Sequence, residues 1–332
     1  MLAPATVVLS GILGVTLDEV AELSGYQLLL VGCFGLIVSA LARKYGKRPQ
    51  FVFAAVMGVI GTGICIAAHE DYNTLLAGRL IQGFGTTAFE SLSVAMLGDM
   101  YFVHERGVRT GIMVLCLTNL PHQESATRSH AQAFYVSLSY VLAQIWSLPP
   151  YNLTPEGNGY FYVGGNNLPC LIGGLIGGIG SGKLCDSTSR TLARRNRGIY
   201  EPEFRIPAQA LAALLLGVGY FVFMWDMQHT GGYYLGAFCH GCVCAGVTVT
   251  SSSAALYILD SYKEQATEIF ILQMTAKNLL FYGFSTFVNS WVADEGPARM
   301  FMVYGVVSLC IVATCVPMCE FSACLYLRSN NG

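Results

Sequence analysis

Charged side chains are scarce in this sequence of 332 residues. Asp, Glu, Lys and Arg together make up 11% of it, which is less than half of their usual share in a soluble domain. Hydrophobic residues make up 54%, and the mean hydropathy is +0.52. A soluble enzyme of this composition would need long buried helices throughout its fold, so the composition argues against that class.

Several long stretches contain no charged residue at all. They are 23–42, 49–69, 157–182, 206–225, 227–259, 278–293 and 300–319. Most of them reach the ~20 residues that a helix needs to cross the hydrocarbon layer of a bilayer. Lipid offers the backbone no hydrogen-bond partners, so repeated runs of this length indicate helices, which satisfy their own N–H and C=O groups. The sequence therefore predicts an all-α, multi-pass integral membrane protein in contact with the lipid bilayer.

Lys and Arg are nearly absent from every second loop. If each apolar run is one span and spans alternate in direction, one side of the membrane holds Arg299 alone. The other side holds Arg43, Lys44, Lys47, Arg48, Arg106, Arg109, Lys183, Arg190, Arg194, Arg195, Arg197, Arg205, Lys263 and Arg328. Because basic residues mark cytoplasmic loops, we expect 43–49, 102–109, 183–206 and 261–267 in the cytoplasm.

Signatures of catalysis and of metal binding are also lacking. No set of nucleophile, base and acid occurs outside the apolar runs, so we expect no enzyme activity. Cys239, His240, Cys242 and Cys244 form a possible ligand set, but their spacing matches no zinc pattern. We therefore expect no metal and no cofactor, and we expect no nucleic-acid partner.

Short motifs recur in the loops and at the ends of the apolar runs. ALARKYGKRPQF (40–51) joins two spans, and Arg79, Gln82 and Gly83 form an R-x-x-Q-G pattern in the next apolar stretch. GKLCDSTSRTLARRNRGIYEPEFR (182–205) contains a G-x-L-x-D spacing. Further motifs are GDMYFVHERGVRTG (98–111), SLPPYNLTPEG (147–157), YILDSYKEQATE (257–268) and KNLLFYGFSTFVN (277–289). Together they resemble the major facilitator superfamily (MFS), and most closely a fungal branch with proton-coupled drug exporters and polyamine or cation transporters.

The resemblance implies a fold and a function. Members have twelve helices in two six-helix halves, and the substrate site lies at the membrane midplane between the halves. By this resemblance the protein is a secondary transporter that moves a small cation, polyamine or drug by proton-coupled alternating access. A monomer in the plasma membrane is expected. A receptor built on the same scaffold is an alternative, although no sequence feature favours it.

Charges in the cytoplasmic loops are implied to take part in gating. They are Arg43, Lys47, Arg48, Asp99, Asp186, Arg190 and Asp260. The family usually has an acid three residues before Gly46, where this sequence has Arg43, so Asp99 and Glu105 are the nearest substitutes for that acid. An internal repeat supports a chain of two halves. In each half a basic loop (40–48 or 183–197) and two spans are followed by a similar triplet, which is DMY at 99–101 and DSY at 260–262.

A polar segment interrupts the apolar pattern at 119–131, within TNLPHQESATRSHAQAF (118–134). Aligned with the family, the chain lacks the end of helix five, helix six and the start of helix seven, and helix one is truncated. We expect about nine to ten of the twelve spans, with 1–118 as the remnant of the N-terminal half and 132–332 as the C-terminal half. The segment between them is interpreted as a seam, left either by a gene model that skipped or misread an exon or by a real internal deletion, and a real deletion would make the protein a non-transporting remnant. A real re-entrant segment or extracellular loop is the alternative.

Ionisable residues inside apolar runs are candidates for function because lipid penalises their charge. Arg79 and Glu90 lie eleven residues apart, close to three helical turns, with Gln82 and Thr86 on the same stripe. Glu90 would bind a cation or the coupling proton while Arg79 balances the charge. A purely structural pairing of Arg and Glu across helices explains these residues equally well.

A second polar stripe runs through the apolar stretch near residue 280. It consists of Asn278, Tyr282, Ser285 and Asn289, with Lys277 alongside. Lining of a polar cavity and hydrogen bonding between helices are equally good explanations. Two aromatic residues, Trp146 and Tyr151, are further candidates for substrate contacts. Glycines 173, 174, 177, 178 and 182 are interpreted as positions where helices pack closely.

Overall fold

Helices joined by turns make up the described part of the chain. The computed structural model describes residues 6–69, 71–100, 126–147, 151–152, 168–229, 232–262 and 265–314, and no strand occurs in these ranges. The helices are α1 (Thr6–Leu13), α2 (Leu17–Tyr45), α3 (Arg48–Ala67), α4 (Tyr72–Met100), α6 (Ala126–Ser147), α8 (Leu168–Arg195), the 3-10 helix η3 (Pro202–Arg205), α9 (Ala208–Gln228), α10 (Tyr233–Ser261), α11 (Ala266–Ser285), α12 (Val288–Glu295) and α13 (Pro297–Ala313). The prediction of an all-α membrane protein is confirmed.

Fewer helices are apolar enough to span a bilayer than the expected nine to ten. Among the described residues, four qualify by length and composition, namely Leu17–Tyr45, Arg48–Ala67, Pro202–Gln228 and Tyr234–Ser261. A fifth span is possible if α12 and α13, which are bent by 119° at Gly296, act as one. The helices α4, α6, α8 and α11 have 20 to 29 residues. They are long enough to cross a bilayer, but polar side chains lower their hydropathy.

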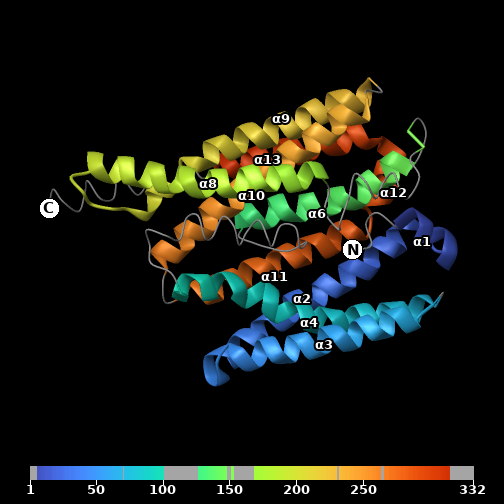
Figure 1. Cartoon of the computed structure of the whole chain (residues 1–332). Coiled ribbons are helices and arrows are strands. Elements are labelled where there is room, and N and C mark those ends of the chain that lie inside the picture. Colours follow the sequence, from blue (N-terminus) through green and yellow to red (C-terminus); the bar gives the residue numbers. More distant parts are fainter. Residues whose placement is uncertain are drawn as a thin grey trace.

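The turns between helices lie at two opposite ends of the bundle. In Figure 1 the α2–α3 turn, the connection from α8 through η3 to α9, and the α10–α11 turn lie at the left end. The α3–α4 turn, the α9–α10 turn and α12 lie at the right end. Of the segments expected in the cytoplasm, 43–49, 183–206 and the described part of 261–267 therefore share one end, as alternating spans require, whereas 102–109 lies outside the described residues. The side of the membrane on which that end lies stays a prediction.

Two groups of helices meet along α11. The helices α2, α3 and α4 pack together in the first group, and α8, α9, α10 and α13 pack together in the second. From the second half of the chain, α11 packs against α2 and α4 of the first half as well as against α6. A buried cluster with Ala21, Tyr140 and Phe281 joins α2, α6 and α11. The interface between the halves is therefore built on α2, α4 and α11.

Glycines allow α8 and α10 to approach each other closely. A Cβ atom added at Gly177 would lie 2.7 Å from the backbone oxygen of Ala245, and one at Gly173 would collide with the backbone of Gly241. Both contacts are with α10 backbone, which cannot move aside as a side chain can. The prediction of close packing is confirmed at Gly173 and Gly177.

The second polar stripe does not lie on one helix. The chain leaves α11 after Ser285, turns through 286–287 and enters α12 at Val288, so Asn289 is separated from the other three residues. The expectation that Asn289 continues the α11 stripe is therefore wrong. The sequence pattern did not reveal the turn, because the residues around it are as apolar as those of the helix.

The polar seam at 119–131 is helical in its last part. The helix α6 begins at Ala126, six residues before the expected start of the C-terminal half at 132. Residues 101–125, which include the first part of this segment, lie outside the described residues. The division of the chain into 1–118, 119–131 and 132–332 stays a prediction.

Candidate functional site

A buried ion pair joins the two halves of the chain. The Nζ atom of Lys277 on α11 contacts Oε1 of Glu90 on α4, and the two side chains are 2% and 1% exposed. Opposite charges in a low-dielectric interior can persist when they are paired, whereas removing one partner leaves a costly buried charge. The two candidates on different stripes therefore form one site, and the partner of Glu90 is Lys277.

Arg79 is engaged elsewhere on α4. Its Nη1 atom donates a 3.2 Å hydrogen bond to Oε1 of Gln82, whose Nε2 atom donates a 3.0 Å hydrogen bond to Oγ1 of Thr62 on α3. Arg79 is half-buried, and its Nε atom has no hydrogen-bond partner. The R-x-x-Q-G pattern thus makes polar contacts within the first group of helices.

The other residues of the predicted α11 stripe face α2. A Cβ atom added at Gly32 of α2 would lie 3.2 Å from Cβ of Asn278. Asn278 is fully buried, and neither its amide oxygen nor its amide nitrogen has a hydrogen-bond partner. The ring of Tyr282 lies 5.4 Å from that of Tyr26 on α2. An unsatisfied buried polar group costs about 1–3 kcal/mol, so Asn278 is a position at which a polar ligand would be favoured.

A second charged cluster lies at the end of the bundle that contains the α10–α11 turn. The Nε atom of Arg205 donates hydrogen bonds to Oδ2 of Asp260, at 2.6 Å, and to the Tyr200 hydroxyl, at 2.9 Å. Its Nη1 atom lies 3.2 Å from Oδ1 of Asp186. The Arg205 side chain is 2% exposed. Two of the predicted gating carboxylates, Asp186 and Asp260, thus converge on one arginine.

Tyr200 completes this cluster as a hydrogen-bond donor. Burial raises the pKa of its hydroxyl, although the neighbouring Arg205 acts in the opposite direction. The hydroxyl therefore stays protonated and donates a 2.5 Å hydrogen bond to Oδ2 of Asp260. Neither Tyr200 nor Arg205 was a candidate on sequence grounds, although both belong to the motif at 182–205 that carries part of the resemblance.

Polar contacts tie α2 to the second half of the chain at both ends. At one end, Nη1 of Arg43 lies 2.5 Å from Oε1 of Glu268 on α11, with side-chain exposures of 72% and 43%. At the other end, Asp18 accepts hydrogen bonds from the backbone N–H groups of Asn289 and Ser290, at 3.1 and 3.2 Å. Asn289 is therefore a residue of the interface between the halves, at the first turn of α12.

The other predicted loop charges have different surroundings. Arg48 and Arg190 are exposed, and Lys47 is half-buried. Asp99 lies in the last turn of α4, among residues whose side chains the structure does not describe. Glu105 lies outside the described residues.

Trp146 and Tyr151 lie together in an aromatic core. Their ring centroids are 4.7 Å apart, and Trp146, which is 2% exposed, stacks at 6.3 Å with Phe223 of α9. Trp146 belongs to the largest described apolar cluster, which also contains Phe301 of α13. Its environment accounts for Trp146 as a core residue of the second half.

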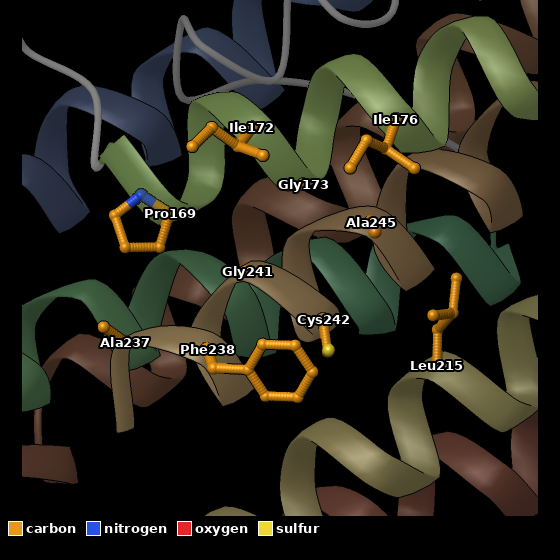
Figure 2. Close-up of a pocket in the computed structure, with 10 residues that line it drawn as sticks. All are labelled: Pro169, Ile172, Gly173, Ile176, Leu215, Ala237, Phe238, Gly241, Cys242 and Ala245. Atoms are coloured by element: carbon orange, nitrogen blue, oxygen red, sulfur yellow. The ribbon is translucent and has the colours of Figure 1, made fainter. Parts of the chain in front are cut away.

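An apolar groove of about 370 Å³ lies on the outside of the second group of helices (Figure 2). It is formed by α8, α9 and α10, and its lining residues are Pro169, Ile172, Gly173, Ile176, Leu215, Ala237, Phe238, Gly241, Cys242 and Ala245. Ile176 and Phe238 are 67% and 61% exposed, so the groove opens towards lipid. It offers no polar group for a charged solute. In the described parts of the chain, no group of three or more His, Cys, Asp or Glu residues could hold a metal ion.

Comparison with known proteins agrees with this architecture. Residues 1–118 match the family model of the Major Facilitator Superfamily. The chain is 29% identical over 181 residues to an uncharacterized MFS-type transporter of Schizosaccharomyces pombe, which covers 52% of this chain and 29% of that protein. It is 28% identical over 178 residues to Protein HOL1 of Saccharomyces cerevisiae, covering 51% of this chain and 28% of that protein.

Two further relatives extend the comparison. A probable efflux pump, mfs2, of Aspergillus flavus is 30% identical over 156 residues, covering 46% of this chain and 35% of the pump. The matched parts thus span about a third of the length of these curated relatives. Among solved structures, the proton:xylose symporter XylE, bound to 6-bromo-6-deoxy-D-glucose, superposes with a TM-score of 0.53 at 13% identity, covering 94% of this chain and 90% of XylE. At that identity the match shows a shared fold.

Proposed function

We propose that this chain, a member of the major facilitator superfamily, is a secondary transporter that carries a small cationic solute across the membrane by alternating access. The observation that carries the proposal is the Glu90–Lys277 pair, buried between the halves. A carboxylate kept inside a membrane bundle is costly unless it has a function or a partner. Here the partner comes from the opposite half, so movement between the halves changes the surroundings of the carboxylate.

The two ends of the interface fit such a movement. The Arg43–Glu268 pair is exposed to solvent, and exposed pairs contribute about 0–1 kcal/mol. The Asp18 contacts at the other end are hydrogen bonds to one helix terminus. The Arg43–Glu268 end can therefore open at small cost, whereas the buried Arg205 cluster keeps α8, η3 and α10 together as a rigid unit.

Glu90 is the proposed binding group for the solute cation or the coupling proton. Asn278 and Tyr282 contribute polar groups from α11, whereas Arg79 and Gln82 lie two to three helical turns from Glu90 along α4 and bond to each other. The cation, polyamine or drug class and the coupling to protons rest on the resemblance to the fungal branch, as does the plasma membrane as location. A carrier of this kind is a monomer with no enzymatic step.

Uptake into proteoliposomes tests the proposal. The purified full chain would be reconstituted, and uptake of radiolabelled spermidine and tetraethylammonium would be followed under an imposed pH gradient. We expect gradient-driven uptake of at least one probe by wild type and none by Glu90→Gln at equal incorporation. The matched control is Asp294→Asn, which changes an exposed carboxylate on α12. If Glu90→Gln took up the probes as fast as wild type, Glu90 would have no role in transport.

A second possibility is that the chain is a non-transporting remnant. The polar segment at 119–131, which interrupts the apolar pattern, favours it. Long-read sequencing of transcripts across codons 115–135 separates the two. If an exon was skipped or misread, the reads encode roughly two further helices between Leu117 and Phe134, each of ~20 residues. Reads that contain only the present junction would favour the remnant.

A further inference from the structure

Lys277 brings a cation of the chain itself to the proposed solute site. Its ammonium contacts Glu90, and the two side chains are 2% and 1% exposed. A lysine side chain ends in a primary ammonium, a compact charge with three N–H donors on a flexible four-carbon stem. A solute that carries a primary ammonium would present the same group to the same carboxylate.

Two ammonium groups at one buried carboxylate would leave an uncompensated positive charge in a low-dielectric space, which is costly, so the solute and Lys277 compete for Glu90. We propose that Lys277 is a tethered competitor, which occupies Glu90 when the site is empty and is replaced there by the primary ammonium group of the solute. This inference rests on the proposed function, since it specifies the class of solute and the state of the empty site. The chain thereby avoids a bare buried carboxylate, which would destabilise the empty carrier.

The neighbouring Asn278 favours a solute with a second polar group. It follows Lys277 directly on α11, is fully buried, and has neither a donor nor an acceptor satisfied. Asn278 faces Gly32 of α2, whereas Lys277 contacts Glu90 of α4. A solute that extends from Glu90 towards α2 and ends in a hydroxyl, amine or carbonyl would therefore supply the missing hydrogen bond. Arg79 is a poorer competitor for Glu90, because its guanidinium already donates to Gln82 on its own helix.

The alternative role of the pair is purely structural, as a bridge between α4 and α11. The two roles predict opposite effects of Lys277→Gln on cation binding. If Lys277 competes with the solute, its removal tightens binding, because Glu90 no longer has to be vacated. If Lys277 only holds the helices together, its removal loosens the site and weakens binding.

Binding of propylammonium to the purified full chain tests the inference. The midpoint of thermal unfolding would be measured in detergent as the probe is titrated, since a ligand that binds only the folded state raises it. We expect Lys277→Gln to reach half of the maximal shift at a probe concentration about tenfold or more below that of wild type, the range of one charge-assisted hydrogen bond. Lys44→Gln, which changes an exposed lysine of α2, should behave like wild type.

Two further measurements support the assignment to Glu90. The double variant Glu90→Gln with Lys277→Gln should lose the tight binding, and tetramethylammonium, which has no N–H donor, should bind more weakly than propylammonium. If Lys277→Gln does not fold alone, we expect propylammonium added during purification to restore a folded, monodisperse protein. Failure of that rescue, or equal half-saturation in Lys277→Gln and wild type, would overturn the proposal.

The outcome can be separated from that of the proposed function. Binding of propylammonium requires no transport. If Lys277→Gln binds it tightly but the wild-type chain shows no uptake, the competitor role of Lys277 stands and the transporter function is rejected. Uptake by wild type without tighter binding in Lys277→Gln would retain the transporter and reject the competitor.

Discussion

Nε of Arg205 donates a 2.6 Å hydrogen bond to Oδ2 of Asp260, 55 residues further along the chain, and both side chains are 2% exposed. Arg205 ends the helix η3, and Asp260 lies in the last turn of α10. Because Asp186 of α8 contacts the same guanidinium, this arginine fixes three elements at one end of the bundle.

Loss of Arg205 should destabilise the second half of the chain. Arg205→Ala leaves Asp260 buried without its cation, which costs about 3–5 kcal/mol. Arg205→Lys keeps the charge but loses the planar fork that serves two carboxylates, so its effect should be smaller. Chemical denaturation in detergent measures both. Arg194→Ala, at an exposed position of α8, is the control and should change little. Equal stability of Arg205→Ala and Arg194→Ala would show that the cluster contributes nothing.

Substitution of Gly177 by Leu should block the close packing of α8 on α10. A Cβ atom there meets the Ala245 backbone oxygen at 2.7 Å, so the helices must separate before a larger side chain fits. We expect a strongly reduced yield of folded, monodisperse protein after detergent extraction. Gly180→Leu is a matched control on the same helix, because a Cβ atom there has no neighbour within 4 Å. Similar yields for both variants would contradict the packing.

The orientation of the bundle can be tested with single cysteines in a background that lacks the twelve native ones. Arg194 and Asp294 are exposed and lie near opposite ends of the helices. From the distribution of basic residues, we expect a membrane-impermeant thiol reagent added to intact cells to label Asp294→Cys and to spare Arg194→Cys. The reverse labelling pattern would mean that the basic loops lie outside the cell.

Asp71 should make the start of α4 sensitive to acid. Hydrogen bonds from the Thr74 side chain and from the backbone N–H groups of Thr74 and Asn73 hold the pKa of this carboxyl below its usual value. A lowered pKa means that the stabilisation is complete above the unfolded-state value, about 3.9, and is lost as the pH falls through the lower folded-state value. Asp71→Asn should therefore flatten the pH dependence of the unfolding midpoint below about pH 4. An unchanged acid limb in Asp71→Asn would show that this cap does not contribute.

Composition and motifs were sufficient for the class of protein and for much of its fold. Apolar runs of about 20 residues permit only helices in lipid, and their number and order were enough to predict a multi-pass helical bundle with its basic loops at one end. Local chemistry also explains the glycines of α8, because small residues at helical spacing favour close contact with a neighbour. Each of these inferences depends on residues that are near in sequence.

Only the tertiary structure decided which charges meet. Glu90 and Lys277 are 187 residues apart, and the helical period places Arg79 on the same stripe as Glu90 although it bonds to Gln82. Arg205 gave no signal as a buried partner, because its burial comes from the joint packing of α8, η3 and α10. Asn289 lies in α12, beyond a turn that the helical period of the sequence does not reveal. Helix packing sets these pairings, since it determines which faces of distant segments are in contact and which charges share a buried, low-dielectric space.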